Sequence, residues 1–143
     1  MYEGNPGNLI KMIQIKKTIT DRLIEHSRED LPIEACGYLA GSNDIITKHY
    51  KLANADNSPV HYSFHPEDQF EMIRKSREEG LEIMACYHSH PATPARPSQE
   101  DIRLAYDPEI MYVIISLADS VPEIKAFRII NGKVSHEELI VID

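Results

Sequence analysis

The fourteen residues from His88 to Asp101, HSHPATPARPSQED, constrain the fold of this chain more than any other stretch. His88 and His90 are separated by one residue, so their side chains project from the same side of an extended strand. Ser98, followed three residues later by the acid Asp101, is typical of the first turn of a helix. Two imidazoles and a carboxylate can bind a metal ion and leave one coordination position open, as in catalytic zinc sites. The pattern therefore predicts a metal site where a strand end meets a helix start.

The size and charge of the chain exclude some classes of function. A chain of 143 residues is long enough for one domain that buries about two-thirds of the surface exposed by its unfolded form. Its 23 acidic and 15 basic side chains give a formal net charge of -8. A field of this sign repels nucleic acid and anionic membranes, so we expect neither as a partner.

The cysteine content and the termini indicate the compartment and the domain limits. The two cysteines have the spacing of neither a disulfide framework nor a metal knuckle. The sequence also has no apolar run long enough to span a membrane and no secretory signal at its start. We therefore expect a cytoplasmic protein. Residues 1–11 are expected to be a flexible extension or a cloning remnant, with Met12 as a candidate natural start, and residues 12–143 a single domain.

Helices are predicted in three places. The first covers residues 18–29 and begins with a capping box at Thr18. The second covers residues 66–80, starts with a proline and ends at a glycine, and is expected to turn Phe70 and Ile73 inward. The third is short and begins at the serine of the motif.

Strands are predicted for the short apolar runs. The run MYVIISL is the most strongly strand-like, and we expect it to be the central strand. The dipeptide Asn131-Gly132 favours a two-residue type I′ hairpin, so the runs on either side should pair. The order of elements predicts the α+β class, with a curved mixed sheet flanked by helices in an α/β/α arrangement. The predicted strands cover residues 33–40, 45–52, 60–64, 81–87, 111–117, 124–130 and 134–141.

The candidate residues support hydrolysis. A zinc ion with three protein ligands keeps a water molecule in the fourth position and lowers its pKa from about 15.7 to about 7. Amide hydrolysis also needs a group that carries a proton from water to the leaving nitrogen. Glu34 is the candidate, because it lies in the apolar run IEACGYLA, where desolvation raises the pKa of a carboxyl group. Ser98 is a candidate donor to the oxyanion, an interaction worth roughly 3 to 4 kcal/mol.

These residues together resemble the signature of the JAMM or MPN-plus zinc metallopeptidases, an upstream Glu followed by H-x-H-x7-S-x2-D. The resemblance extends over about residues 12 to 120 and includes EACGYLAG around the glutamate and ARPSQED before the third helix. It implies the cytidine-deaminase-like fold of that family and one zinc ion per chain. It also implies the site roles: His88, His90 and Asp101 as zinc ligands, Glu34 as the acid-base group and Ser98 as the oxyanion partner.

The flanking residues are most similar to the compact prokaryotic branch of this family. Its members cleave an amino acid from the C-terminal glycine of a ubiquitin-like sulfur-carrier protein. The resemblance therefore implies hydrolysis of a peptide or isopeptide bond after a Gly-Gly tail, for example with release of cysteine. It is compatible with either a monomer or a homodimer. Eukaryotic deubiquitinases of this fold carry longer insertions that grip two ubiquitins, whereas the segment 53–80 is short here, which disfavours polyubiquitin chains as substrates.

Two other functions fit parts of the same pattern. Two histidines and an aspartate are also the ligands of iron(II) oxygenases, but these need a co-substrate pocket, for which only Arg96 and Arg103 are candidates. A non-catalytic scaffold of the MPN type is the second alternative, although such relatives typically lose ligands and this sequence retains them all.

Each candidate also has a purely structural interpretation. Ser98 and Asp101 taken alone are a helix cap, and a lone acid in an apolar run more often faces solvent. Cys86 has the strand parity of His88, but a free cysteine is usually a small buried apolar group. Cys36 is expected in the core for the same reason. The remaining candidates are expected to be surface or loop residues (His49, His61, His65 and His136) or core residues (Tyr87, Met111 and Tyr112).

Overall fold

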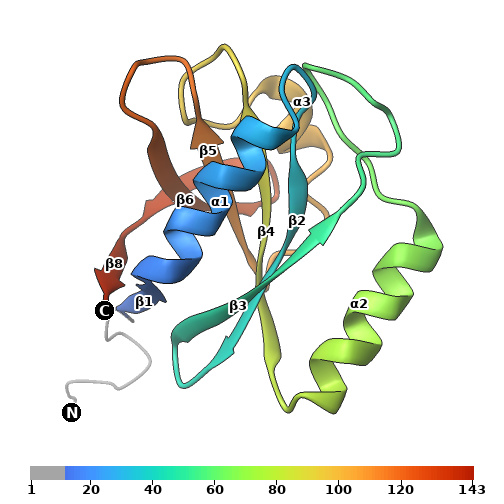
Figure 1. The fold of residues 1–143 in the computed structure, drawn as a ribbon, viewed down its shortest axis with the longest axis vertical. Coiled ribbons are helices and arrows are strands. Elements are labelled where there is room, and N and C mark those ends of the chain that lie inside the picture. The colour runs from blue at the N-terminus through green and yellow to red at the C-terminus, as the bar shows by residue number, and fades with distance from the viewer. Residues whose placement is uncertain (1–11) are drawn as a thin grey trace.

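A computed structural model describes residues 12–143; the extension expected at residues 1–11 lies outside the described residues. Over this range, three helices are interspersed among the first strands, and the elements after the third helix are all strands (Figure 1). In chain order the elements are β1 (Ile13–Lys16), α1 (Lys17–Glu29), β2 (Cys36–Ser42), β3 (Ile45–Leu52), α2 (Pro66–Glu78), β4 (Glu82–His90), α3 (Gln99–Arg103), β5 (Met111–Ser116), β6 (Glu123–Ile130), β7 (Lys133–Glu137) and β8 (Leu139–Ile142).

The eight strands form one mixed sheet in the order β7-β6-β5-β4-β2-β3-β1-β8. The pairs β4–β5, β1–β3 and β1–β8 are parallel, and the other pairs are antiparallel. Strands β7 and β8 stand at opposite ends of this order, yet only Glu138 separates them in the chain. Because consecutive Cα atoms are about 3.8 Å apart, the sheet has to curl until its two edges approach each other. The predicted α+β class with a curved mixed sheet is confirmed.

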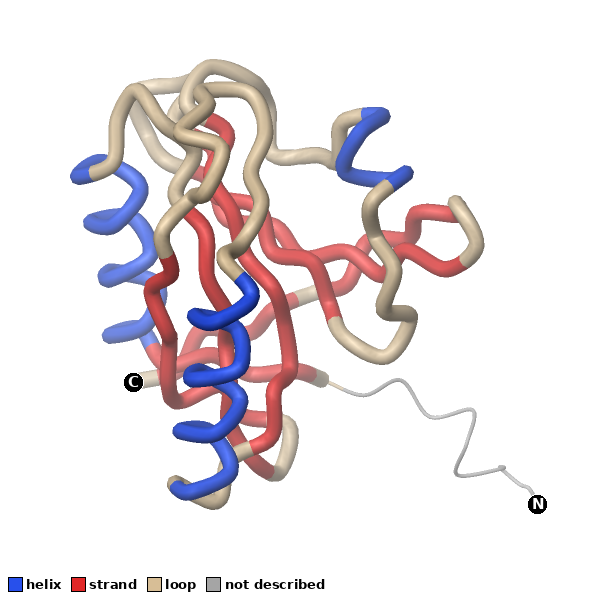
Figure 2. Tube along the Cα trace, turned by 90° about the vertical axis from the view of Figure 1, so that its right-hand side faces the viewer, coloured by secondary structure: helices blue, strands red, loops and turns tan. Residues whose placement is uncertain are grey.

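Helices cover both faces of the curled sheet (Figure 2). On one face, α1 buries Ile19 and Leu23 against residues of β2, β4 and β5 such as Leu39 and Val113. On the other face, Met72 of α2 packs near Tyr50, and Ile102 of α3 packs on a cluster from β4, β5 and β6. Every residue of β5 is buried, as expected, but β4 and β2 rather than β5 form the middle pair of the sheet. The metal motif therefore stands on one of the two central strands.

The N-terminal strand β1 was not predicted. Its sequence IQIK buries both isoleucines in the core cluster that includes residues of α1, and β1 itself lies between β3 and β8. The chain enters α1 directly from this strand, so Lys16 occupies the N-cap position without a side-chain cap, and Thr18 is exposed within the first turn. The predicted capping box is therefore wrong.

Two predicted strands differ in the structure. Residues 60–64 are irregular, and their aromatic side chains pack beside β4 without joining the sheet. The run 134–141 is divided at Glu138, and its second half crosses to the far edge of the sheet, where it pairs with β1. The hairpin between β6 and β7 is confirmed, because Asn131 and Gly132 have the positive φ angles (51° and 78°) that a type I′ turn requires.

Helix α2 packs through a different stripe from the one predicted. Phe70 and Ile73 are 75% and 38% exposed, whereas Met72 is only 3% exposed. Met72 and Ser76 are four residues apart and lie on the same side of the helix, facing the sheet. The prediction that Phe70 and Ile73 face inward is therefore wrong.

We expect Met72→Ala to lower the free energy of unfolding by about 2 to 4 kcal/mol, because it leaves a cavity against the sheet. Phe70→Ala removes a larger side chain from the same helix, yet it should change this free energy by less than about 0.5 kcal/mol because the ring is exposed. Urea unfolding of both variants provides the comparison. Equal losses in the two variants would contradict this packing.

Candidate metal centre

The two histidines of the motif lie at the end of β4, a strand that is paired on both sides. His88 lies opposite Cys36 of β2 and Ile114 of β5, and His90 lies opposite Ser116. Both imidazoles are buried and project to the face that carries α2 and α3. The predicted strand ended at residue 87, but β4 includes both histidines, so the sheet fixes their backbone directly.

The carboxylate of the motif is held at the start of α3. The Ser98 Oγ accepts a hydrogen bond from the Asp101 amide at 3.0 Å, and the Ser98 amide donates to the Asp101 Oδ2 at 2.9 Å. These two bonds form a capping box around the first turn of the helix. The structural interpretation of this pair is thus confirmed, and the same Oδ2 atom also faces the histidines.

Three atoms converge on one point. The His88 Nε2, His90 Nε2 and Asp101 Oδ2 atoms are each 3.1 Å from the other two. Ligands of a tetrahedral zinc ion, about 2.0 to 2.1 Å from the metal, are roughly 3.3 Å apart, so the triangle fits such an ion. A single proton shared between two of these atoms forms only one hydrogen bond, so it does not account for all three close contacts. Among the described residues, no other group of three His, Cys, Asp or Glu side chains comes as close together.

The electrostatics of this cluster also suit a cation. Burial lowers the pKa of His88. Burial also acts on His90, but hydrogen bonding to Asp101 and to the Pro94 carbonyl outweighs it and raises the pKa. Burial likewise opposes ionisation of Asp101, yet the hydrogen bonds from His88 and His90 hold the pKa of this carboxyl well below its usual range. The carboxylate is therefore charged and can neutralise part of a bound cation.

The tautomer of His90 follows from its second nitrogen. The His90 Nδ1 lies 2.8 Å from the Pro94 carbonyl oxygen, which can only accept a hydrogen bond. The Nδ1 therefore carries the proton, and in the neutral ring the Nε2 lone pair is free for a metal ion. His88 is oriented differently. Its Nδ1 is buried without a hydrogen-bond partner among the described residues, and its ring stacks on Tyr62 with the ring centroids 4.6 Å apart.

Glu34 lies next to this cluster. The residue precedes β2 rather than lying within a strand, which differs from the prediction, but Ala35 still exchanges hydrogen bonds with Ser89 of β4. Continuing this antiparallel register by one residue puts Glu34 across from His90, on the same face as the imidazoles. The carboxyl group is buried and its Oε1 has no hydrogen-bond partner among the described residues. Burial raises the pKa of Glu34 to about 8, against an opposing effect of His90.

The raised pKa of Glu34 leads to a stability prediction for the metal-free protein. From the ordinary value of 4.5 up to about 8, the folded state retains the proton that the unfolded state has lost. The contribution of Glu34 to the free energy of unfolding should therefore fall as pH rises through this range and level off above it. Glu34→Gln removes this dependence. Between pH 4.5 and pH 8, the free energy of unfolding of the variant should therefore increase relative to that of the wild type by an amount on the order of 4 kcal/mol. Urea unfolding in chelator at both pH values measures the difference, and parallel pH profiles would contradict it.

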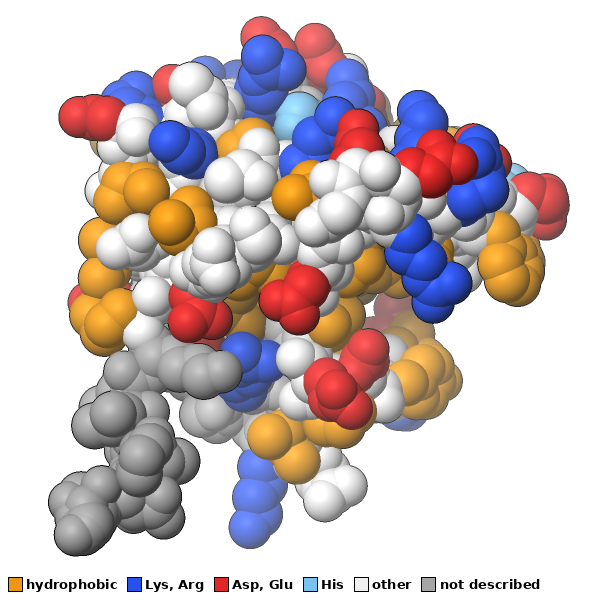
Figure 3. Space-filling view, turned by 90° about the horizontal axis from the view of Figure 1, so that it is seen from below, with side chains coloured by type: hydrophobic (Ala, Val, Ile, Leu, Met, Phe, Trp, Pro, Cys, Tyr) orange, Lys and Arg blue, Asp and Glu red, His pale blue; other side chains and the backbone are white. Residues whose placement is uncertain are grey.

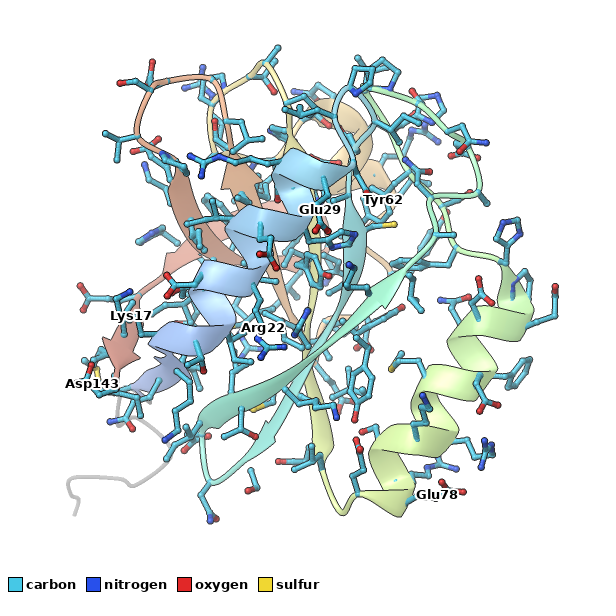
Figure 4. All side chains as sticks on the ribbon, in the orientation of Figure 1. Lys17, Arg22, Glu29, Tyr62, Glu78 and Asp143 are labelled. Atoms are coloured by element: carbon cyan, nitrogen blue, oxygen red, sulfur yellow. The ribbon has the colours of Figure 1, made fainter. Side chains whose placement is uncertain are left out.

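A groove leads away from the cluster. It has a volume of about 1020 Å³ and runs from His88 and Asp101 between α2 and residues 104–110. Figure 3 shows this hollow from below, with apolar side chains along it and carboxylates at its edge. The wall nearest the metal ligands is Tyr62, whose hydroxyl lies 3.5 Å from the Cys86 Sγ beside β4 (Figure 4).

The remaining sequence candidates lie outside the cluster. Cys86 lines the groove and Cys36 is buried, and neither belongs to the three-residue group. Arg96 is exposed, and Arg103 pairs with Glu100 on α3. His61 pairs with Asp56, His65 and His136 are exposed, and His49 is half-buried on β3, while Tyr87, Met111 and Tyr112 are in the core as predicted.

The buried polar residues His26 and Asn54 were not found from the sequence. His26 of α1 bonds to the hydroxyl of Tyr87, on the opposite face of β4, and to Asp30. Asn54 is buried in the segment between β3 and α2 and binds several backbone groups. The only sequence signal for either residue is a polar side chain next to an apolar run, which is common in surface loops.

Comparison with known proteins decides the family. The model of a family described as prokaryotic homologs of the JAB domain matches residues 16–130, most of the chain. The chain belongs to this family. The resemblance of the motif to JAMM peptidases is therefore confirmed, and with it the expectation of a hydrolase of that class. Among residues 12–143, no helix is both long and apolar enough to cross a membrane.

Relatives of this JAB-family chain include two curated peptidases. It is 33% identical over 137 residues to the CysO-cysteine peptidase of Mycobacterium tuberculosis. This match covers 94% of each of the two chains. It is also 33% identical over 103 residues to the desampylase of Haloferax volcanii, covering 67% of this chain and 74% of the relative. A solution structure of a protein from Desulfitobacterium hafniense matches with a TM-score of 0.85 and 42% identity, covering 92% of this chain and 94% of the other.

Proposed function

We propose that this protein is a zinc-dependent peptidase that hydrolyses the peptide or isopeptide bond after the C-terminal glycine of a sulfur-carrier or ubiquitin-like protein. The observation that carries the proposal is the convergence of three ligand atoms 3.1 Å apart beside the buried Glu34, whose Oε1 has no hydrogen-bond partner among the described residues. The names of the relatives support the substrate class, since one cleaves a CysO-cysteine conjugate and the other is a desampylase.

The ligand set favours zinc as the metal. Two imidazole nitrogens and one carboxylate oxygen are a common set in catalytic zinc sites. When bound, zinc supplies a Lewis acid and lowers the pKa of a coordinated water to about 7. His88, His90 and Asp101 would hold the ion, with the His90 ring fixed by its bond to the Pro94 carbonyl.

Two further side chains would handle the proton and the developing charge. The Glu34 Oε1 has no hydrogen-bond partner among the described residues, and a cation bound nearby would favour the ionised form of this carboxyl group, so Glu34 could take a proton from the attacking water and return it to the leaving nitrogen. The Ser98 Oγ accepts a hydrogen bond from the Asp101 amide, which leaves its own hydroxyl proton to donate to a substrate oxyanion. The groove beside Tyr62 would take the extended tail that precedes the cleaved bond.

The test uses a small carrier protein of β-grasp fold that ends in Gly-Gly and is extended by one cysteine. Zinc-loaded protein is incubated with this substrate, and mass spectrometry follows the loss of the cysteine residue. A carrier ending in Ala-Ala-Cys is the matched control. Release from the Gly-Gly carrier alone supports the proposal. No release from any carrier conjugate, with peptide or isopeptide linkage, would overturn it, and oxygen uptake with iron would then favour an oxygenase.

A further inference from the structure

The carboxyl group of Glu34 is buried, and its Oε1 has no hydrogen-bond partner among the described residues. The position of the carboxyl group therefore depends on the backbone that carries it. This backbone lies outside the regular sheet, because the β2–β4 ladder ends at the pair formed by Cys36 and His88.

Asn54 holds the backbone of Glu34 from one side. Its side-chain amide donates to the Glu34 carbonyl oxygen at 3.1 Å, while the Glu34 amide donates to the Ser58 carbonyl oxygen at 2.9 Å. The same Asn54 side chain donates to the His61 carbonyl oxygen at 3.1 Å. Its Oδ1 accepts a hydrogen bond from the Asp56 amide at 3.0 Å. One buried amide group thus folds the segment 54–63 and attaches it to Glu34.

Ser89 holds the same backbone from the other side. Its Oγ accepts a hydrogen bond from the Ala35 amide at 2.8 Å, and its own amide donates to the Ala35 carbonyl oxygen at 2.9 Å. Ser89 is fully buried and lies between the two candidate metal ligands, His88 and His90. Its two bonds therefore tie the residue after Glu34 to the strand that carries the imidazoles.

We propose that Asn54 and Ser89 are positioning residues that set the distance between Glu34 and the metal ligands. Ser89 continues the bonding between β4 and the residues before β2 by one residue beyond the Cys36–His88 pair, to Ala35, and Asn54 holds the Glu34 carbonyl from the segment that follows β3. The inference rests on the proposed function, because the position of Glu34 matters only if this carboxyl group acts on a reacting water. A misplacement of about 1 Å is enough to cost on the order of 100-fold in rate.

The test compares variants that remove a hydrogen bond to the backbone of Glu34 or Ala35 with a variant that removes neither. Asn54→Asp keeps an acceptor for the Asp56 amide but loses the donor to the Glu34 carbonyl, and Ser89→Ala loses the acceptor for the Ala35 amide. Each should lower kcat by about 10- to 100-fold, with KM and zinc affinity changed less than twofold. Asp56→Ala is the control, because it removes two side-chain bonds from the same segment, to His61 and Ser63, without touching Glu34. It should stay within twofold of the wild type.

A purely structural role would give a different result. If Asn54 and Ser89 act through Glu34, Asn54→Asp and Ser89→Ala should have little further effect on the residual rate of a Glu34→Gln variant. Loss of zinc affinity in parallel with kcat would overturn the proposal, as would unchanged kcat in both folded variants. If Asn54→Asp does not fold, the kcat and zinc affinity of Ser89→Ala alone test the proposal.

Hydrogen exchange separates this inference from the proposed function, because it needs neither substrate nor zinc. The Ala35 amide should exchange at least tenfold faster in Ser89→Ala than in the wild type, and the Glu34 amide faster in Asn54→Asp, with no change in Asp56→Ala. Unchanged exchange at both amides would overturn the positioning role. Failure of the wild type to cleave any carrier conjugate would instead overturn the proposed function.

Discussion

Glu34→Gln should lower the rate of carrier-conjugate hydrolysis by about 100- to 10,000-fold, the usual contribution of a general acid-base group. Glutamine has nearly the same shape and can fill the buried space beside His90, but its amide cannot take up and return a proton. Because Glu34 is not among the three ligand atoms, the variant should still bind one zinc ion. The expected result is therefore a folded, zinc-loaded and nearly inactive protein.

The measurement pairs kcat with zinc content determined by elemental analysis. Glu67→Gln, an equivalent change at an exposed position in the first turn of α2, is the control and should leave kcat within about twofold. Full activity of zinc-loaded Glu34→Gln would remove Glu34 from the acid-base role. Loss of zinc from the variant would instead make Glu34 part of the metal site.

The second large effect is expected from Asp101→Ala. This change removes one of three converging ligand atoms, so zinc affinity should fall by more than about 100-fold, the upper end of what loss of an outer-shell partner costs. Activity should be lost with the metal. Competition with a chromophoric chelator measures the affinity, and retention of one tightly bound zinc ion per chain would contradict the assignment.

Ser98→Ala separates metal binding from helix capping. Asp101→Ala and Ser98→Ala each break the capping box of α3, and loss of a typical cap costs about 1 kcal/mol of stability. Only Asp101 supplies a ligand atom, so Ser98→Ala should retain its zinc. Its rate should nevertheless fall by about 100- to 1,000-fold if the hydroxyl donates to the oxyanion. Equal loss of zinc in the two variants would mean that the cap, rather than the carboxylate ligand, holds the site together.

The metal cluster could be predicted from the sequence because its geometry is encoded locally. A spacing of two on a strand puts His88 and His90 on one face, and a spacing of three at a helix start ties Ser98 to Asp101. Glu34 is more than fifty residues away in the chain, so it was connected to the cluster only by its place in an apolar run and by the family resemblance. Asn54, which bonds to the Glu34 carbonyl, and Ser89, which bonds to Ala35, are brought there by tertiary contacts that no local sequence pattern specifies.

The errors in the predicted fold have the same origin. The run 134–141 alternates like one strand, and nothing within it shows that β8 leaves β7 to pair with β1 on the far edge. Residues 60–64 have strand-like composition, but their aromatic side chains pack against the groove wall instead. For α2, both Phe70 and Met72 are apolar, and only the position of the sheet decides which of them is buried.

The pairing of β1 with β8 has a consequence for how the protein forms during translation. These two strands are more than a hundred residues apart in the chain, so the curled sheet cannot close until β8 has emerged from the ribosome. Strands β2, β4 and β5 emerge earlier and pair with one another without it. The candidate metal centre can therefore assemble on the nascent chain while β1 still lacks its second neighbour. The long-range closing step, which pairs β1 with β8, then falls at the edge of the sheet away from β4 and its two histidines.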